Sequence, residues 1–170
     1  RAFCEGRKVL TLSESLRFLE AYRIPTVKTL VAATPDEATK FSSELGYPTV
    51  MKALSPQFTH KSEIEGVILG VCSPSEVPVF YNKLSEMVKK SSATAEFQGV
   101  AIQGMIRKKG YEILIGSKKD PQFGSTILFG TGGTATEFFK DISIGFPPLN
   151  KVLARRLMEN TKIYKHASSS

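Results

Sequence analysis

The sequence predicts an α+β fold built as two lobes. Helix-start signals alternate with short apolar runs bounded by turn residues, and most of the second half reads as antiparallel strands. The 170 residues, 41% of them hydrophobic, suffice for one substantial core or for two small lobes that share a site. Because the pattern shifts near Ser73, we expect lobes at residues 1–72 and 73–170. A cleft between lobes is a common place for a ligand.

Local signals predict four helices. In three of them a Ser or Thr cap is followed three residues later by glutamate, which is the capping-box pattern. Gly46 supplies the stop of the second helix, and Pro35 suits its first turn. The three caps are Thr11, Thr34 and Ser73, and the fourth helix is expected over residues 150–159.

Short β-branched runs between these helices predict the strands. The segment RKKG at 107–110 predicts a hairpin between its two neighbours, and the last eight residues, IYKHASSS, read as a loop or frayed tail. The expected strands are 26–32, 48–54, 66–71, 99–106, 111–118, 125–130 and, more weakly marked, 142–146.

Composition limits the classes of function. The formal charge is +7, but the basic residues are scattered and no aromatic-basic motif appears, so nucleic acid is not an expected partner. No apolar run reaches membrane-spanning length. Cys4 and Cys72 lack Cys-x-x-Cys spacing and are expected to be reduced thiols in a cytoplasmic protein. The chain lacks an initiator Met and a signal core, so we expect a piece of a larger polypeptide.

Two residues in the stretch YPTVMKALSPQFTHKSEIEGV raise a chemical question. Lys52 interrupts an apolar strand, where it either faces solvent or holds a phosphate as a point charge on a rigid element. His60 either sits exposed in a loop or acts as a nucleophile that accepts a phosphoryl group. In the second case Lys61 would steady the incoming charge and Glu63 would orient the ring.

Glycine-rich turns form a third feature. The strings KDPQFG and FGTGG could let backbone N–H groups approach phosphate oxygens, although ordinary turns contain such strings too. Neither GxxxxGK[ST] nor a strand-GxGxxG-helix pattern is present, so a P-loop or Rossmann site is not supported.

Taken together, these segments resemble one family. GYPTVMK, SPQFTHKSEIEGV, AIQGM, YEILIGSKKDPQFGS, LFGTGG and FPPLNKVLARRL are similar, in order, to the ATP-grasp domain of NDP-forming acyl-CoA synthetases, from about Val9 to Lys165. The resemblance implies an ATP-grasp fold and an acid–CoA ligase (ADP-forming) that interconverts acyl-CoA, phosphate and ADP with free acid, CoA and ATP. It also implies that phosphate travels on histidine.

The resemblance assigns roles residue by residue. His60, with Lys61 beside it, matches a loop histidine proposed as a second phosphate carrier, and Lys52 matches the lysine on the nucleotide phosphates. Gln103 matches a position near the adenine. Further nucleotide-binding residues implied in this way are Glu112, Glu137, Gly132 and Gly133.

The chain departs from the family pattern in three places. Glu65 replaces a glycine, and Gly104 stands where a carboxylate that contacts adenosine is common. Related chains continue to an Asp-Ile-Asn-Pro-Leu-type segment that binds Mg²⁺, so no metal ligand is expected within these residues. We therefore expect a C-terminally truncated ATP-grasp domain that uses ATP or ADP with Mg²⁺ and is inactive when isolated.

The expected partners follow from the same resemblance. They are the nucleotide and the CoA-binding and CoA-ligase domains or subunit of the same enzyme, with an oligomer formed by the full-length protein. One alternative is the synthetase-like region of protein lysine acetyltransferases, which senses acyl-CoA without turnover and which AYRIPT and PPLNKVLARRL also resemble. Another is an interaction domain whose basic surface binds an acidic partner and which does not depend on Lys52.

Overall fold

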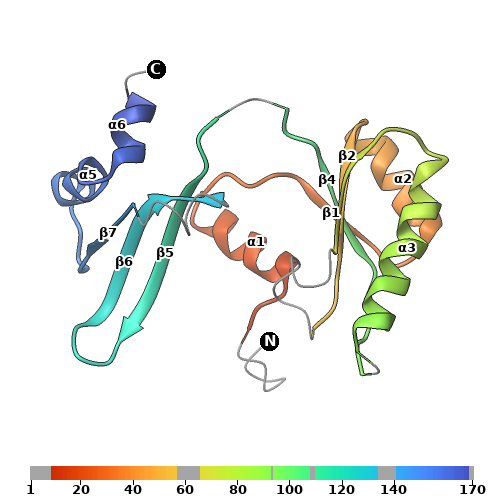
Figure 1. Cartoon of the computed structure of the whole chain (residues 1–170), viewed down its shortest axis with the longest axis horizontal. Coiled ribbons are helices and arrows are strands. Elements are labelled where there is room, and N and C mark those ends of the chain that lie inside the picture. The colour runs from red at the N-terminus through yellow and green to blue at the C-terminus, as the bar shows by residue number, and fades with distance from the viewer. Residues whose placement is uncertain (1–8, 57–65, 93, 108–109, 134–140, 169–170) are drawn as a thin grey trace. The chain divides into compact units, whose positions relative to one another are not determined.

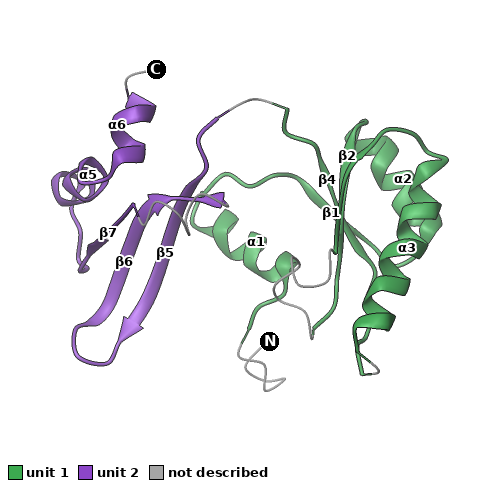
Figure 2. Ribbon diagram, viewed as in Figure 1, with its two compact units in different colours: residues 1–107 green, residues 108–170 purple. Residues whose placement is uncertain are grey.

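The chain forms two compact units, residues 1–107 and 108–170 (Figure 2). The computed structural model describes residues 9–56, 66–92, 94–107, 110–133 and 141–168, and each unit is described by itself. The first unit extends beyond the expected lobe boundary at residue 72, because the following helix and strand complete its core. Within the described residues, no helix is both long and apolar enough to cross a membrane.

The first unit is a four-stranded antiparallel sheet with two helices packed on one face (Figure 1). The strand order is β1-β4-β2-β3, so the last strand of the unit lies between two earlier ones. Helix α1 lies on the other side of the sheet from α2 and α3 (Figure 1). The elements are α1 (Leu12–Ala21), β1 (Thr29–Ala32), α2 (Pro35–Leu45), β2 (Thr49–Ala53), β3 (Val67–Val71), α3 (Glu76–Ser91) and β4 (Val100–Gly104).

Two of the predicted helix starts are confirmed in detail. The Thr11 hydroxyl accepts from the Glu14 amide and the Glu14 carboxylate accepts from the Thr11 amide, which completes the capping box. Thr34 caps α2, whose first residue is Pro35. The cap predicted at Ser73 is wrong: α3 begins at Glu76, and the side chain of its N-cap residue makes no capping hydrogen bond.

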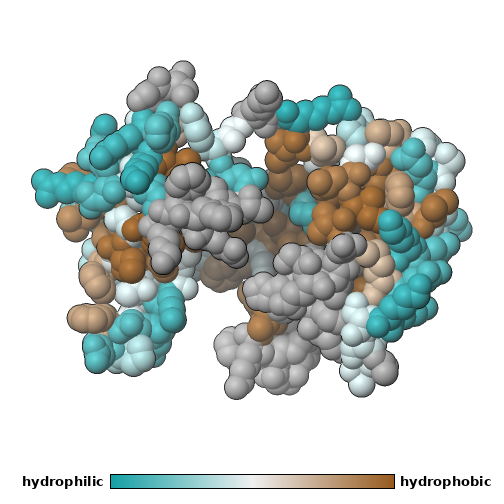
Figure 3. All heavy atoms as spheres, in the orientation of Figure 1, coloured by the Kyte–Doolittle hydropathy of each residue, from teal (hydrophilic) through white to brown (hydrophobic). Residues whose placement is uncertain are grey.

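The core of the first unit lies between the sheet and helices α2 and α3. Strand β2 alternates, so Met51 and Ala53 point into this core while Lys52, between them, points to the opposite face. Each large apolar side chain buried here contributes about 1.5–3 kcal/mol. Figure 3 shows apolar side chains gathered where these strands meet the helices, and polar ones on the outer side of α3. The fully buried members include Ala32, Met51, Val71, Val77, Leu84, Val88, Val100 and Ile102.

The second unit is a three-stranded antiparallel sheet in the order β5-β6-β7, followed by two helices. Its core joins Phe129 of the sheet to Leu157 and Ile163 of the helices. The Asp120 carboxylate accepts from the amides of Gln122 and Phe123 and so shapes the turn between β5 and β6. The elements are β5 (Ile113–Asp120), β6 (Gly124–Thr131), β7 (Ile142–Gly145), α5 (Lys151–Glu159) and α6 (Lys162–Ser168).

Two expectations for this half of the chain are wrong. The segment 107–110 does not form a hairpin, because β4 and β5 belong to different sheets and β5 pairs with β6 instead. The loop or frayed tail predicted from residue 163 onward is wrong for the described residues, because residues 162–168 form α6. This helix packs on the sheet through Ile163, and its first two amides donate to Asp141, which lies far earlier in the chain.

Candidate functional site

The face of the first sheet opposite α2 and α3, on the side where α1 lies, carries two of the predicted nucleotide-binding residues; it is called the α1-side face below. In the register of β2 and β4, Lys52 lies opposite Ala101 and Val50 lies opposite Gln103. Directly paired residues share a face, and so do residues two apart on one strand. Lys52 and Gln103 are therefore diagonal neighbours on the α1-side face, at a spacing of roughly 7–8 Å. The fold brings together two residues that are 51 positions apart in the sequence.

Lys52 is a half-buried cation for which the described residues supply no counter-charge. Burial lowers the pKa of its ammonium group, and no other cause contributes to the shift. Within the described part of the chain, no carboxylate lies within 4.0 Å of its Nζ atom. A half-buried ammonium normally acquires an anionic partner, because loss of water around it is costly. Its place on a rigid strand suits it to hold an anionic ligand such as a phosphate.

Gln103 is held in place by Thr29, a residue that sequence reasoning missed. Its amide Nε2 donates to the Thr29 hydroxyl oxygen at 2.7 Å, and that hydroxyl donates to the Val27 carbonyl at 2.8 Å. Thr29 pairs directly with Gln103 across β1 and β4. No local motif marks this threonine, so only the strand register reveals its role.

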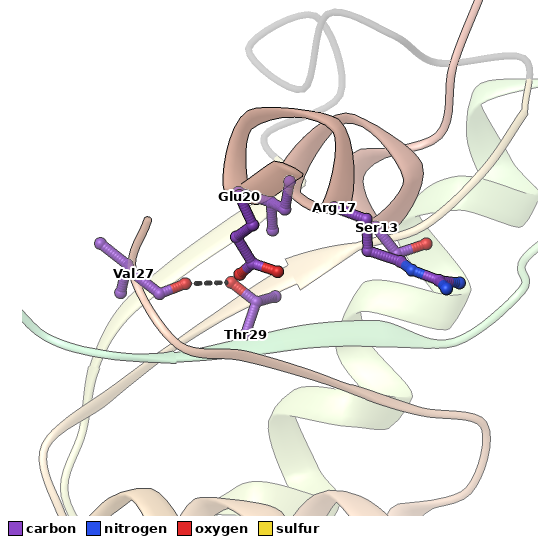
Figure 4. Close-up of a pocket in the computed structure, with 6 residues that line it drawn as sticks. Ser13, Arg17, Glu20, Val27 and Thr29 are labelled. Atoms are coloured by element: carbon purple, nitrogen blue, oxygen red, sulfur yellow. Dashed lines mark hydrogen bonds between the residues drawn. The ribbon is translucent and has the colours of Figure 1, made fainter. Parts of the chain in front are cut away.

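A small hollow lies beside Thr29, between α1 and the start of β1. Its volume is about 180 Å³, and Ser13, Arg17, Glu20 and Val27 line it together with Thr29 and Leu16. Figure 4 shows Glu20 reaching from α1 toward Thr29, whereas the guanidinium group of Arg17 extends away from it. The Glu20 carboxylate accepts from the Thr26 hydroxyl at 2.8 Å.

The Gly132–Gly133 pair, predicted to bind nucleotide, packs tightly against Glu112 in the second unit. The Gly132 amide donates to the Glu112 carbonyl at 2.7 Å. Gly133 has φ +67°, and a Cβ atom there would lie 1.8 Å from Glu112 Oε2. The positive φ favours glycine here, and a larger residue would also require the Glu112 carboxylate to move aside. The described contacts therefore give the pair a packing role, with the Gly132 amide already engaged by protein.

Asp141 forms the most connected polar group of the second unit, and sequence reasoning missed it as well. Its carboxylate accepts from the amides of Lys162 and Ile163, each at 2.9 Å, and from the Thr131 hydroxyl at 3.0 Å. Burial raises the pKa of Asp141, but these hydrogen bonds outweigh it and the net pKa is lowered. The carboxylate is ionised at neutral pH and joins β6, β7 and α6.

Four predicted site residues, His60, Lys61, Glu63 and Glu137, lie outside the described residues. Among the residues that are described, no group of three or more His, Cys, Asp or Glu side chains could hold a metal ion. The described candidate residues are Lys52, Gln103 and Thr29 in the first unit and, separately, Glu112 with its two glycines in the second.

A two-sheet α+β architecture with a strand lysine on the α1-side face is what an ATP-grasp domain would present. The family model for the ATP-grasp domain matches residues 1–170, so the chain belongs to the ATP-grasp family. The fold expectation is confirmed.

The similar proteins include ADP-forming acetate–CoA ligases. Subunit beta of acetate–CoA ligase (ADP-forming) II from Pyrococcus furiosus is 38% identical over 160 residues, which are 94% of this chain and 67% of that protein. Subunit beta of the corresponding ligase I from the same organism is 36% identical over 164 residues, or 96% of this chain and 70% of that protein.

A solved structure gives the same result. Acetyl-coenzyme A synthetase 1 from Ca. Korarchaeum cryptofilum, in complex with coenzyme A and Ca-AMPCP, superposes with a TM-score of 0.90 at 38% identity. The match covers 96% of this chain and 71% of that one. The same synthetase with Mg-AMPPCP, its phosphohistidine segment pointing towards the nucleotide binding site, gives a TM-score of 0.77 at 35% identity and covers 96% of this chain and 69% of that one.

Proposed function

We propose that this chain is the nucleotide-binding part of an ADP-forming acyl-CoA synthetase. The enzyme couples acyl-CoA, phosphate and ADP to free acid, CoA and ATP. The observation that carries the proposal is Lys52, a half-buried cation on a rigid strand, with no carboxylate near it among the described residues and with Gln103 beside it. A nucleotide whose phosphates meet Lys52 would neutralise this charge.

The other predicted site residues have the following roles in the proposed reaction. His60 receives the phosphoryl group, with Lys61 steadying the charge, while Glu112, Glu137 and the Gly132–Gly133 pair contribute to nucleotide binding. Mg²⁺, as found with the nucleotide analogue in the Korarchaeum enzyme, would neutralise the phosphates during transfer. The full-length cytoplasmic enzyme is an oligomer in which other domains bind CoA. The similar proteins are ligases, which favours an enzyme over a domain that only senses acyl-CoA.

The first test is calorimetric titration of the protein with Mg-ATP and Mg-ADP. Lys52→Ala should weaken binding by roughly 10- to 100-fold, because hydrogen bonds to charged groups contribute about 1.5–3 kcal/mol. Lys83→Ala is the matched control: it removes an exposed lysine from α3, which packs on the other face of the sheet. Binding that is equally tight in the Lys52→Ala and Lys83→Ala proteins would refute the assignment of Lys52.

A second test addresses His60. The full-length protein should incorporate phosphate from γ-labelled ATP as an acid-labile, base-stable product, and His60→Asn should reduce this labelling without weakening Mg-ATP binding. Labelling that is unchanged in His60→Asn would remove His60 from the phosphoryl pathway.

A further inference from the structure

The hydroxyl group of Thr29 has its single proton committed. It donates to the Val27 carbonyl at 2.8 Å (Figure 4). Toward Gln103, 2.7 Å away, the same oxygen can act only as an acceptor. The group facing it must then be the amide nitrogen, because two acceptors would repel each other. The backbone of the chain thus decides which way the Gln103 amide points.

The consequence is that Oε1 of Gln103 is presented away from Thr29 as an acceptor. No hydrogen bond joins this oxygen to another part of the described chain. Gln103 is partly buried on the same α1-side face as Lys52, so its oxygen can accept from a ligand that binds beside Lys52. A glutamine with a free amide could turn over and present either group, but this one is fixed.

We propose that Thr29 is a positioning residue that makes the site prefer adenine over guanine nucleotides. The inference rests on the proposed function, in which phosphates lie at Lys52 and the base lies toward Gln103. Adenine carries an exocyclic amino donor at its 6-position, whereas guanine carries a carbonyl acceptor there. The Oε1 acceptor of Gln103 can therefore accept a hydrogen bond from the 6-amino group of adenine. Beside guanine it would face the O6 atom, which is also an acceptor, and both oxygens would be left without a hydrogen bond.

The test measures a ratio of affinities, which a purely structural role would not change. Mg-ATP and Mg-GTP are titrated calorimetrically into the full-length protein and into Thr29→Val, which keeps the shape of the side chain and removes its hydroxyl. The ratio of the GTP dissociation constant to the ATP dissociation constant should fall about three- to tenfold in Thr29→Val, as expected for one neutral hydrogen bond. The fall should come from weaker ATP binding together with equal or tighter GTP binding, because the freed amide can turn over.

Two control variants test whether the change in the ratio comes from the hydroxyl group of Thr29. Thr29→Ser retains the hydroxyl and should keep the wild-type ratio. Thr26→Val makes the same chemical change three residues away, where the hydroxyl donates to Glu20 instead of meeting Gln103, and should also keep the ratio. If Thr29→Val melts early in circular dichroism, Gln103→Leu tests the same point, because it removes the oriented amide itself.

The possible outcomes separate the two proposals. ATP binding with a ratio unchanged in both Thr29→Val and Gln103→Leu overturns the role of Thr29 and leaves the proposed function standing. Absence of binding to either nucleotide by the wild-type protein overturns both. The inference is supported if the ratio of the GTP to the ATP dissociation constant falls in Thr29→Val and keeps its wild-type value in Thr29→Ser.

Discussion

Removal of the Asp141 carboxylate should lower the free energy of unfolding of the second unit. In Asp141→Ala, three hydrogen bonds to one ionised group are lost, from two amides of α6 and from Thr131. Loss of a side chain that caps a helix start costs about 0.5–2 kcal/mol. The additional hydroxyl bond brings the expected loss to about 2–3 kcal/mol after allowance for the partial exposure of the group. That is a large share of the stability of a small domain.

Urea unfolding followed by circular dichroism measures this loss, and hydrogen exchange locates it. The amides of Lys162 and Ile163 should exchange faster in Asp141→Ala, while amides of β2 and β4 keep their protection. Asp141→Asn is the matched control, since asparagine is also a good capping residue and should recover most of the lost stability. If the urea midpoint of Asp141→Ala equals that of the wild type within error, the Asp141 carboxylate does not stabilise the second unit.

The same carboxylate predicts a dependence on pH. Its folded pKa is depressed, so its contribution to stability is present above the unfolded value of about 3.9 and is lost as the pH falls through the folded pKa. The acid side of the stability curve should therefore be flatter in Asp141→Asn than in wild type. Equal acid slopes in the two proteins would mean that other carboxylates govern acid unfolding.

Three smaller perturbations test other parts of the structure. Gly99→Ala should cost at least about 2 kcal/mol, because its Cβ atom would lie 2.2 Å from the Ala32 carbonyl at φ +113°; an unchanged urea midpoint would contradict that geometry. Gly133→Ala should cost about 1–2 kcal/mol for its positive φ and its contact with Glu112, and normal stability would show that the Glu112 side chain moves aside easily. Thr11→Ala should reduce stability by about 1 kcal/mol through loss of the α1 cap, whereas unaltered helix content on warming would argue against a working capping box.

Local signals allowed the helices of the first unit to be predicted. The caps at Thr11 and Thr34 act within four residues of themselves, so the sequence contains all of the information. Helix α6 was missed for the opposite reason: the group that receives its first amides is Asp141, 21 residues before Lys162. The hairpin predicted at 107–110 was wrong because a turn-like sequence does not reveal which strands pair.

The candidate site also contains one residue that the local sequence reveals and one that only the tertiary structure reveals. Lys52 is conspicuous in the sequence as a charge in an apolar strand, and the family resemblance predicts which of its possible roles it has. Thr29 is inconspicuous, because a threonine in a strand is ordinary. Its relation to Gln103 depends on the register of two strands separated by seventy residues, and register is fixed by tertiary packing rather than by either strand alone.

The strand order of the first sheet has a consequence for how the protein is made. Because β4 lies between β1 and β2, neither of these strands can pair with β4 until residues 100–104 have left the ribosome, and β1 has no partner before then. Up to that point the nascent chain holds β2 and β3 as a lone pair beside an unpaired β1, and both present open hydrogen-bonding edges. Synthesis of the first unit thus passes through a long interval in which its apolar strands need protection, and the arrival of one five-residue segment ends it.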